Sequence, residues 1–201
     1  MKTTWMMAGL MAMAAAASGR STQSNLTGDI TVCVDKEGLR SGLTFRAEFI
    51  AAKIYSAAGI NIHWRTGTLD CAPGALIVSF RQQTPENFKP GALAYALPFE
   101  GTHICVFLDR IDQYQKGEQY MVLGHVLAHE ITHILQGQAR HSETGLMKAR
   151  WSGLDVGEMK RHLLLMSSED ERLVRAGLAH RSEGVLMSQD RPGLARAALA
   201  R

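Results

Sequence analysis

Residues 125–141 read HVLAHEITHILQGQARH and contain two histidines four positions apart, His129 and His133. Apolar residues surround the pair at helical spacing, so we predict a helix over residues 118–136. A separation of four residues is about one helical turn, which places both imidazoles on the same face. Such a pair can chelate one cation. Zinc suits imidazole and accepts a tetrahedral site in which one position remains open for water.

Glu130 directly follows the first histidine. We predict that it does not bind the metal and acts instead as general base on the water that the metal activates. A catalytic zinc needs a third protein ligand. Gly137 is expected to end the helix, because glycine tolerates the left-handed conformation found at helix ends. The chain can then reverse and return His141 to the metal, so the predicted zinc ligands are His129, His133 and His141.

Three other residues compete for the third position. Glu158 lies further downstream at the start of a predicted helix, and Glu143 lies in the loop after His141. His125 lies one turn before the first ligand. A straight helix places His125 and His133 about 12 Å apart along its axis, too far for both to bind one ion. We therefore expect His125 to pack or to position other groups, while His141 and Glu158 both stay open.

A longer pattern carries a resemblance to a known family. The run His129-Glu130-x-x-His133-x-x-x-Gly137-x-x-x-His141-Ser142-x-x-Gly145-x-Met147 resembles the zincin metallopeptidases, and metzincins within them. It looks most like a group of predicted secreted bacterial zinc metalloproteases. The resemblance implies a zinc cofactor, a protein or peptide substrate and a hydrolase that cuts peptide bonds. Metzincins have a shorter loop before the third histidine, so the return of His141 is an inference.

One further role follows from the resemblance. Metzincins have a methionine in a tight turn beneath the metal. Met147 is either that residue or an ordinary core methionine. Two alternatives to a peptidase also remain: a catalytically silent binding protein on a zincin scaffold, or a zinc-dependent amidase that acts on non-peptide bonds. Tyr95, Tyr114 and Arg150 are candidates to assist the oxyanion, and none is preferred.

The rest of the sequence predicts an α+β, zincin-like fold. Strands are expected at residues 30–34, 60–64, 75–80, 92–97 and 103–108, with a helix over 40–58. Prolines flank the weak strand at 92–97, which is typical of an antiparallel edge strand. We therefore predict a mixed five-stranded sheet packed against helices 40–58 and 118–136, followed by C-terminal helices. The edge strand could pair with an extended substrate. A capping-box sequence at residues 168–171 is expected to start the last helix.

The chain divides into a domain and three flanking segments. Residues 1–17 combine a positive start, an apolar stretch and small residues before Ser18, which indicates a signal peptide and a secreted or periplasmic protein. A membrane anchor is the alternative, but the stretch is short against the roughly 20 residues of a span. Residues 18–28 are predicted to be a flexible leader, 29–180 the metalloprotease domain, and 181–201 a frayed tail.

Composition sets further bounds. The net charge is +3, without a run of basic residues, so we expect no nucleic-acid partner. The sequence offers no stable membrane insertion once a signal peptide is removed, and it does not indicate an oligomeric state. The three cysteines, Cys33, Cys71 and Cys105, form either one disulfide with a thiol left over or three buried thiols.

Overall fold

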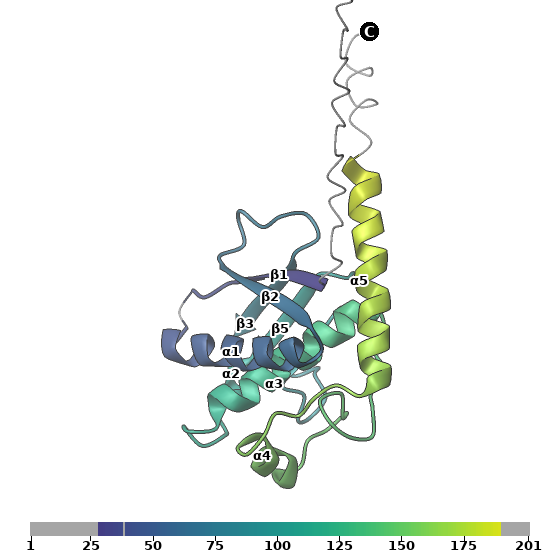
Figure 1. The fold of residues 1–201 in the computed structure, drawn as a ribbon. Helices are drawn as coiled ribbons and strands as arrows, with labels where there is room; N and C mark the ends of the chain where they lie inside the picture. The colour runs from purple at the N-terminus through teal and green to yellow at the C-terminus, as the bar shows by residue number, and fades with distance from the viewer. Residues whose placement is uncertain (1–27, 38, 190–201) are drawn as a thin grey trace, which may run out of the picture.

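The computed structural model describes residues 28–37 and 39–189. The predicted signal peptide therefore lies outside the described residues, as does the leader before Gly28. The described part forms one mixed sheet with helices packed on it, which confirms the predicted fold class (Figure 1). The strands are β1 (Gly28–Val34), β2 (Ile60–Thr66), β3 (Leu76–Arg81), β4 (Ala94–Ala96) and β5 (His103–Phe107). The helices are α1 (Ser41–Ala57), α2 (Leu108–Ile111), α3 (Gln119–Gln136), α4 (Gly153–Met159) and α5 (Ser168–Gln189).

The sheet has the strand order β2-β1-β3-β5-β4. All neighbouring strands are parallel except β4, which pairs antiparallel to β5 with Ala94 opposite Val106. The expected antiparallel edge strand is thus confirmed. Pro90 and Pro98 flank this short strand. Because proline cannot donate a ladder hydrogen bond, such flanks keep the strand short and at the edge.

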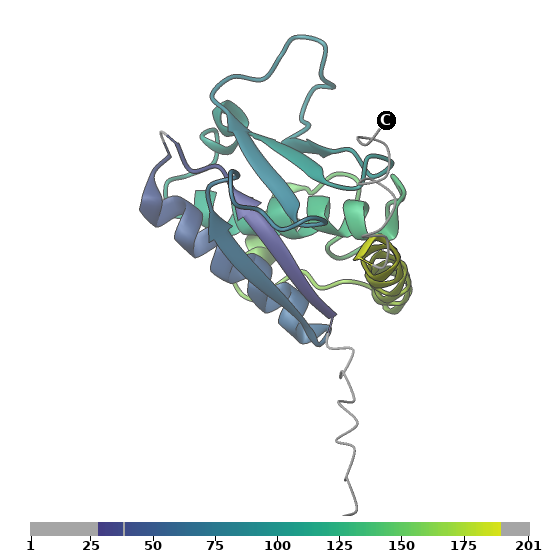
Figure 2. The same cartoon turned by 90° about the horizontal axis from the view of Figure 1, so that it is seen from above.

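The main core lies between one face of the sheet and helices α1 and α3, which Figure 2 shows on the same side of the strands. Alternate residues of β1 point into it, so Val32 and Val34 are buried. The two helices approach each other closely at Gly124. A Cβ atom at this position would lie 2.5 Å from the Cβ of Ile50, so only glycine allows this packing distance.

Loops cover part of the opposite face of the sheet. The ring of Phe88 lies 4.8 Å from that of Phe107, so this loop residue covers the end of β5. A disulfide joins Cys33 of β1 to Cys71 in the loop before β3, with the Cα atoms 6.4 Å apart. Cys105 is buried as a free thiol. Of the two alternatives open from the sequence, the protein therefore has one disulfide and one remaining thiol.

Helix α5 packs against the carboxyl end of α3 (Figure 1). The sequence predicted a frayed tail over residues 181–201, but α5 continues to Gln189, and the rest of the predicted tail lies outside the described residues. The guanidinium of Arg181 donates to the carbonyls of Gly101 and Gly74 at 2.7 and 2.8 Å, which fastens this part of the helix to two loops. Within residues 28–37 and 39–189, no helix is long and apolar enough to span a bilayer.

Candidate metal centre and active site

Helix α3 presents two of the predicted ligands on its face toward β4. His129 and His133 are 8% and 6% exposed, and their Nε2 atoms lie 3.0 Å apart. The helix is buried along almost its whole length because it packs against the sheet, α1 and α5. Both imidazoles therefore sit on a rigid element, which suits a site that must hold its geometry.

The chain reverses after α3 and brings His141 back to this pair. Gly137 caps the helix in the left-handed conformation, with φ of 66°, as expected. The Nε2 atom of His141 lies 3.2 Å from that of His133. The three imidazole nitrogens all lie within 4.8 Å of one another. Within the part of the chain that the structure describes, this is the only such cluster of metal-binding side chains.

The competing residues lie elsewhere. Glu143 and Glu158 are exposed and do not belong to the histidine cluster. His125 hydrogen bonds through Nδ1 to the carbonyl of Met121 at 2.8 Å and accepts from the amide of Leu164 at 3.1 Å. It therefore ties the segment before α5 to α3, which is the positioning role expected for it.

The three histidines fit a zinc ion. His129 Nδ1 lies 2.8 Å from the carbonyl of Leu146, and His133 Nδ1 lies 3.1 Å from that of Gln138. When Nδ1 carries the hydrogen and donates it, the lone pair of Nε2 is free for a metal. Burial, followed by the nearby histidines, lowers the pKa of His129 to about 3, and burial lowers that of His133 to about 4. Neutral nitrogens that converge in this way match the three-histidine donor set of open zinc sites.

Glu130 lies beside the first ligand and lines the same cleft. Burial raises its pKa to about 8, and burial is the sole cause of the shift. No hydrogen-bonding or charged partner within the described residues therefore holds this carboxylate. A divalent cation on the histidines would favour its ionised form. An unengaged carboxylate of this kind can exchange a proton with a water molecule between it and the metal.

Asp170 fixes the loop that carries His141, a role that sequence reasoning missed. Its side chain is fully buried at the start of α5. Its oxygens accept from Gln136 at 3.2 Å, Arg140 at 2.5 Å, and the hydroxyls of Ser142 at 2.7 Å and Ser167 at 2.5 Å. One carboxylate thus joins the end of α3, both neighbours of the third ligand and the cap of α5.

The pKa of Asp170 reflects opposing effects. Burial disfavours the charged form and raises the pKa, but hydrogen bonds from Ser167, Ser142 and Gln136 outweigh it. The net pKa therefore lies below the usual value, and the carboxylate is ionised at neutral pH. The cap of α5 is Ser167 with Asp170, not the expected box that begins at Ser168, because the amide of Asp170 donates to the Ser167 hydroxyl.

A tight turn follows the third ligand. Gly145 has φ of 72°, and the amide of Ser142 donates to the carbonyl of Met147 at 2.7 Å. The carbonyl of Leu146 in this turn is the one that faces His129. Met147 is fully buried in the same turn. The turn therefore supports the metal centre through its backbone and inserts its methionine into the core.

The histidines open into a cleft of about 570 Å³. The cleft runs between β4 and the segment 148–151. The ring of Trp151, which sequence reasoning missed, lies 5.5 Å from that of His129 at 82°, so it braces the ligand edge-on. All three candidates for assisting the oxyanion line the cleft: Tyr95, Tyr114 and Arg150. The ring of Tyr95 also stacks on that of Phe88, with the ring centres 5.0 Å apart.

Among the described residues, no strand pairs with the outer edge of β4. The amide of Phe107 donates to Leu93 at 2.9 Å, and that of Leu97 donates to His103 at 3.1 Å. Because hydrogen-bonded positions alternate in an antiparallel pair, the polar backbone groups of Ala94 and Ala96 point away from β5. β4 is the last strand of the sheet and lines the cleft. An extended chain in the cleft could therefore add to the sheet.

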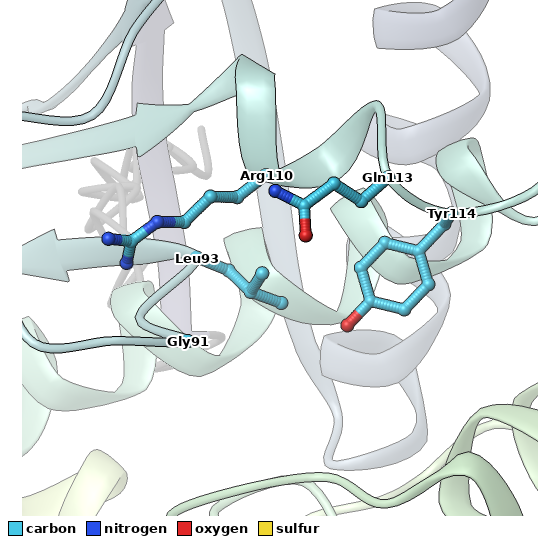
Figure 3. Close-up of a pocket in the computed structure, with 5 residues that line it drawn as sticks. All are labelled: Gly91, Leu93, Arg110, Gln113 and Tyr114. Atoms are coloured by element: carbon cyan, nitrogen blue, oxygen red, sulfur yellow. The ribbon is translucent and has the colours of Figure 1, made fainter.

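A smaller pocket of about 390 Å³ adjoins the cleft. Both are lined by Gly91, Leu93 and Tyr114, while Arg110 and Gln113 line the smaller one alone. Figure 3 shows the Leu93 side chain between those of Arg110 and Tyr114. The cleft and the smaller pocket therefore share part of their walls, and together they reach beyond the three histidines.

Comparisons with known proteins place this geometry in context. No family model matches the sequence, and no curated protein matches it. Among solved structures, the fold is similar to archaemetzincin from Methanopyrus kandleri, with a TM-score of 0.52 and 14% identity over 78% of this chain and 99% of that one. It is also similar to a zinc-dependent peptidase from Methanocorpusculum labreanum, with a TM-score of 0.51 and 11% identity over 72% and 99%. The zincin-like fold expected from the motif is therefore confirmed, and it brings His129, His133 and His141 together as one metal-binding group.

Proposed function

We propose that this protein is an exported zinc metallopeptidase in which His129, His133 and His141 hold the metal and Glu130 is the general base. The observation that carries the proposal is the convergence of three Nε2 atoms next to an unengaged carboxylate in one cleft. The two similar structures support it, since one is an archaemetzincin and the other a zinc-dependent peptidase.

The chemistry follows from the placement of the side chains. Zinc in this site would polarise the scissile carbonyl and lower the pKa of a water molecule toward about 7. Glu130 takes a proton from the attacking water and delivers it to the leaving amine. The free edge of β4 aligns an extended peptide by backbone hydrogen bonds. The buried walls around His129 and His133 strengthen these electrostatic interactions by limiting bulk water.

Export is part of the proposal. The signal-like residues 1–17 support it. The disulfide between Cys33 and Cys71 adds support, because such bonds persist outside the reducing cytoplasm. Sequencing the amino terminus of protein recovered from the extracytoplasmic fraction tests this point. A mature chain that begins just after residue 17 is the expected result, and an intact Met1 on a cytoplasmic protein would contradict it.

The catalytic role is tested with Glu130→Gln. We expect the purified variant to keep one zinc per chain, since the ligands are unchanged, and to lose peptide cleavage by a factor of at least about 10² to 10⁴, the usual share of general acid–base catalysis. Zinc is measured by atomic emission and cleavage with a quenched fluorescent peptide library. Full activity in the variant would remove Glu130 from the mechanism. A zinc-loaded wild type that cleaves no peptide would favour the silent scaffold or the non-peptide amidase.

A further inference from the structure

Basic side chains gather where the cleft meets the smaller pocket. Lys89, Lys148 and Arg150 line the cleft, and Arg110 lines the pocket. The only acidic residue that lines either hollow, within the described residues, is Glu130. Lys148 is neutralised by a salt bridge of 2.7 Å to Asp155. The other three, which we call the cationic rim (Lys89, Arg110 and Arg150), have no carboxylate within ion-pair distance in the described part of the chain.

The rim is organised around one loop, residues 89–92. The guanidinium of Arg110 donates to the carbonyl of Lys89 at 2.9 Å and also to that of Ala92. The guanidinium of Arg150, from the far wall of the cleft, donates to the carbonyl of Pro90 at 3.4 Å. Each guanidinium has five N–H donors, so most of them remain available after these contacts. The backbone thus holds two arginine side chains at one end of the cleft.

One acid lies close to the rim. Asp109 precedes Arg110 and the two charges attract each other, but the Asp109 carboxylate accepts from the Thr84 hydroxyl at 2.8 Å and is not among the ion pairs of the described residues. Figure 3 shows the Arg110 guanidinium extending past Leu93. Positive charge therefore lies at the junction of the two hollows.

The loop that carries the rim leads directly into β4. A peptide that pairs with the edge of β4 places one of its ends beside residues 89–92. Charges of one sign in a cleft with low-dielectric walls raise the local concentration of oppositely charged ligands. Arginine also binds carboxylates through two parallel hydrogen bonds. The chemistry of the rim is therefore that of a receptor for carboxylate side chains.

We propose that the cleft selects peptides that carry Asp or Glu at the end that lies beside residues 89–92, and that the cationic rim recognises those side chains. The inference rests on the proposed peptidase function and names its substrate class. It concerns binding at the rim, and it can therefore be measured separately from cleavage.

The test uses zinc-loaded Glu130→Gln protein, which binds peptides without cutting them, and two labelled peptides that differ only in two Glu or two Lys residues. Fluorescence anisotropy gives the Kd of each. We expect the Glu peptide to bind about tenfold more tightly, the range that two exposed ion pairs allow. This advantage should shrink with added salt. Adding Lys89→Glu and Arg150→Glu together should reverse the preference.

Arg150→Glu alone should reduce the preference, and Arg65→Glu is its matched control, because each single change alters the charge by two units and Arg65 lies on β2, at the opposite edge of the sheet from β4. The Arg65 control should leave the preference unchanged. Equal Kd values for the two peptides, or an equal loss in the Arg65 control, would overturn the inference. Wild-type protein that binds the Glu peptide but leaves it intact would count against the peptidase function and not against the preference.

Discussion

Replacing Asp170 with Asn should lower both the stability of the fold and the affinity for zinc, although Asp170 is not one of the three histidines that would bind the metal. The carboxylate is fully buried and receives hydrogen bonds at both oxygens, including those from Arg140 and Ser142 on either side of His141. Asn keeps the size but removes the charge, and its NH2 group must face one set of donors. Loss of one partner of a buried ion pair costs about 3–5 kcal/mol. Because Arg140 is one-third exposed, we expect a smaller loss of unfolding free energy, about 2–3 kcal/mol.

The loss should appear in both stability and metal binding. For a domain of this size, the thermal midpoint of the metal-free protein should fall by about 5–10 °C. Zinc affinity should fall about 10- to 100-fold, as is typical when a group that orients a ligand is removed. Calorimetry measures the first quantity, and competition with a chromophoric chelator measures the second.

Two controls separate the metal effect from helix capping. Asp155→Asn removes a comparable capping carboxylate from α4, where Asp155 pairs with Ser152 and Lys148, and should leave the zinc Kd unchanged. Ser142→Ala removes one of the two contacts between the His141 loop and Asp170 and leaves the α5 cap intact, so it should weaken zinc binding more than it lowers stability. If Asp170→Asn lowers the thermal midpoint and leaves zinc affinity at the wild-type value, Asp170 is a helix cap and does not position His141.

Three further results are expected. His141→Ala should sharply lower the zinc content per chain. An unchanged zinc content would show that another residue, such as Glu158, is the third ligand. Gly177→Ala should destabilise the protein by about 1–3 kcal/mol, because its Cβ would lie 1.7 Å from a backbone oxygen of α3; Gly157→Ala, with nothing within 4 Å, is the control in urea unfolding. The salt bridge to Lys148, with the cap hydrogen bonds, lowers the pKa of Asp155 from 3.8 to about 2. The ionised Asp155 therefore stabilises the fold above pH 4, and this stabilisation is lost as the pH falls toward 2. The unfolding free energy of the wild type should exceed that of Asp155→Asn above pH 4 and approach it near pH 2; equal values at every pH would contradict this.

The parts of the site that were predictable are those set by local sequence. His129, Glu130 and His133 share one helix, so their relative placement follows from helical geometry alone. Gly137 marks the reversal, because its left-handed conformation is a local property of the chain. The sheet and its edge strand were likewise predictable from alternation and from the flanking prolines.

Asp170 could not be predicted because its partners come from distant segments. Ser167 with Asp170, and Ser168 with Glu171, both fit a capping box. The choice between them depends on which acid is buried when α5 docks on α3. The two helices pack closely at Gly177, where a side chain would clash with the backbone of α3. This contact joins residues far apart in the chain, so the local sequence pattern cannot reveal it.

The attachment of His141 to the amino end of α5 has a consequence for the newly made chain. Two ligands are present once α3 has formed, but the third is held in place only after the final helix has been synthesised and has docked. A chain that ends before Ser167 should therefore hold zinc loosely, and we expect it to be unable to cut its neighbours. If the protein is the proposed peptidase, its activity would therefore appear only once synthesis has reached the last helix.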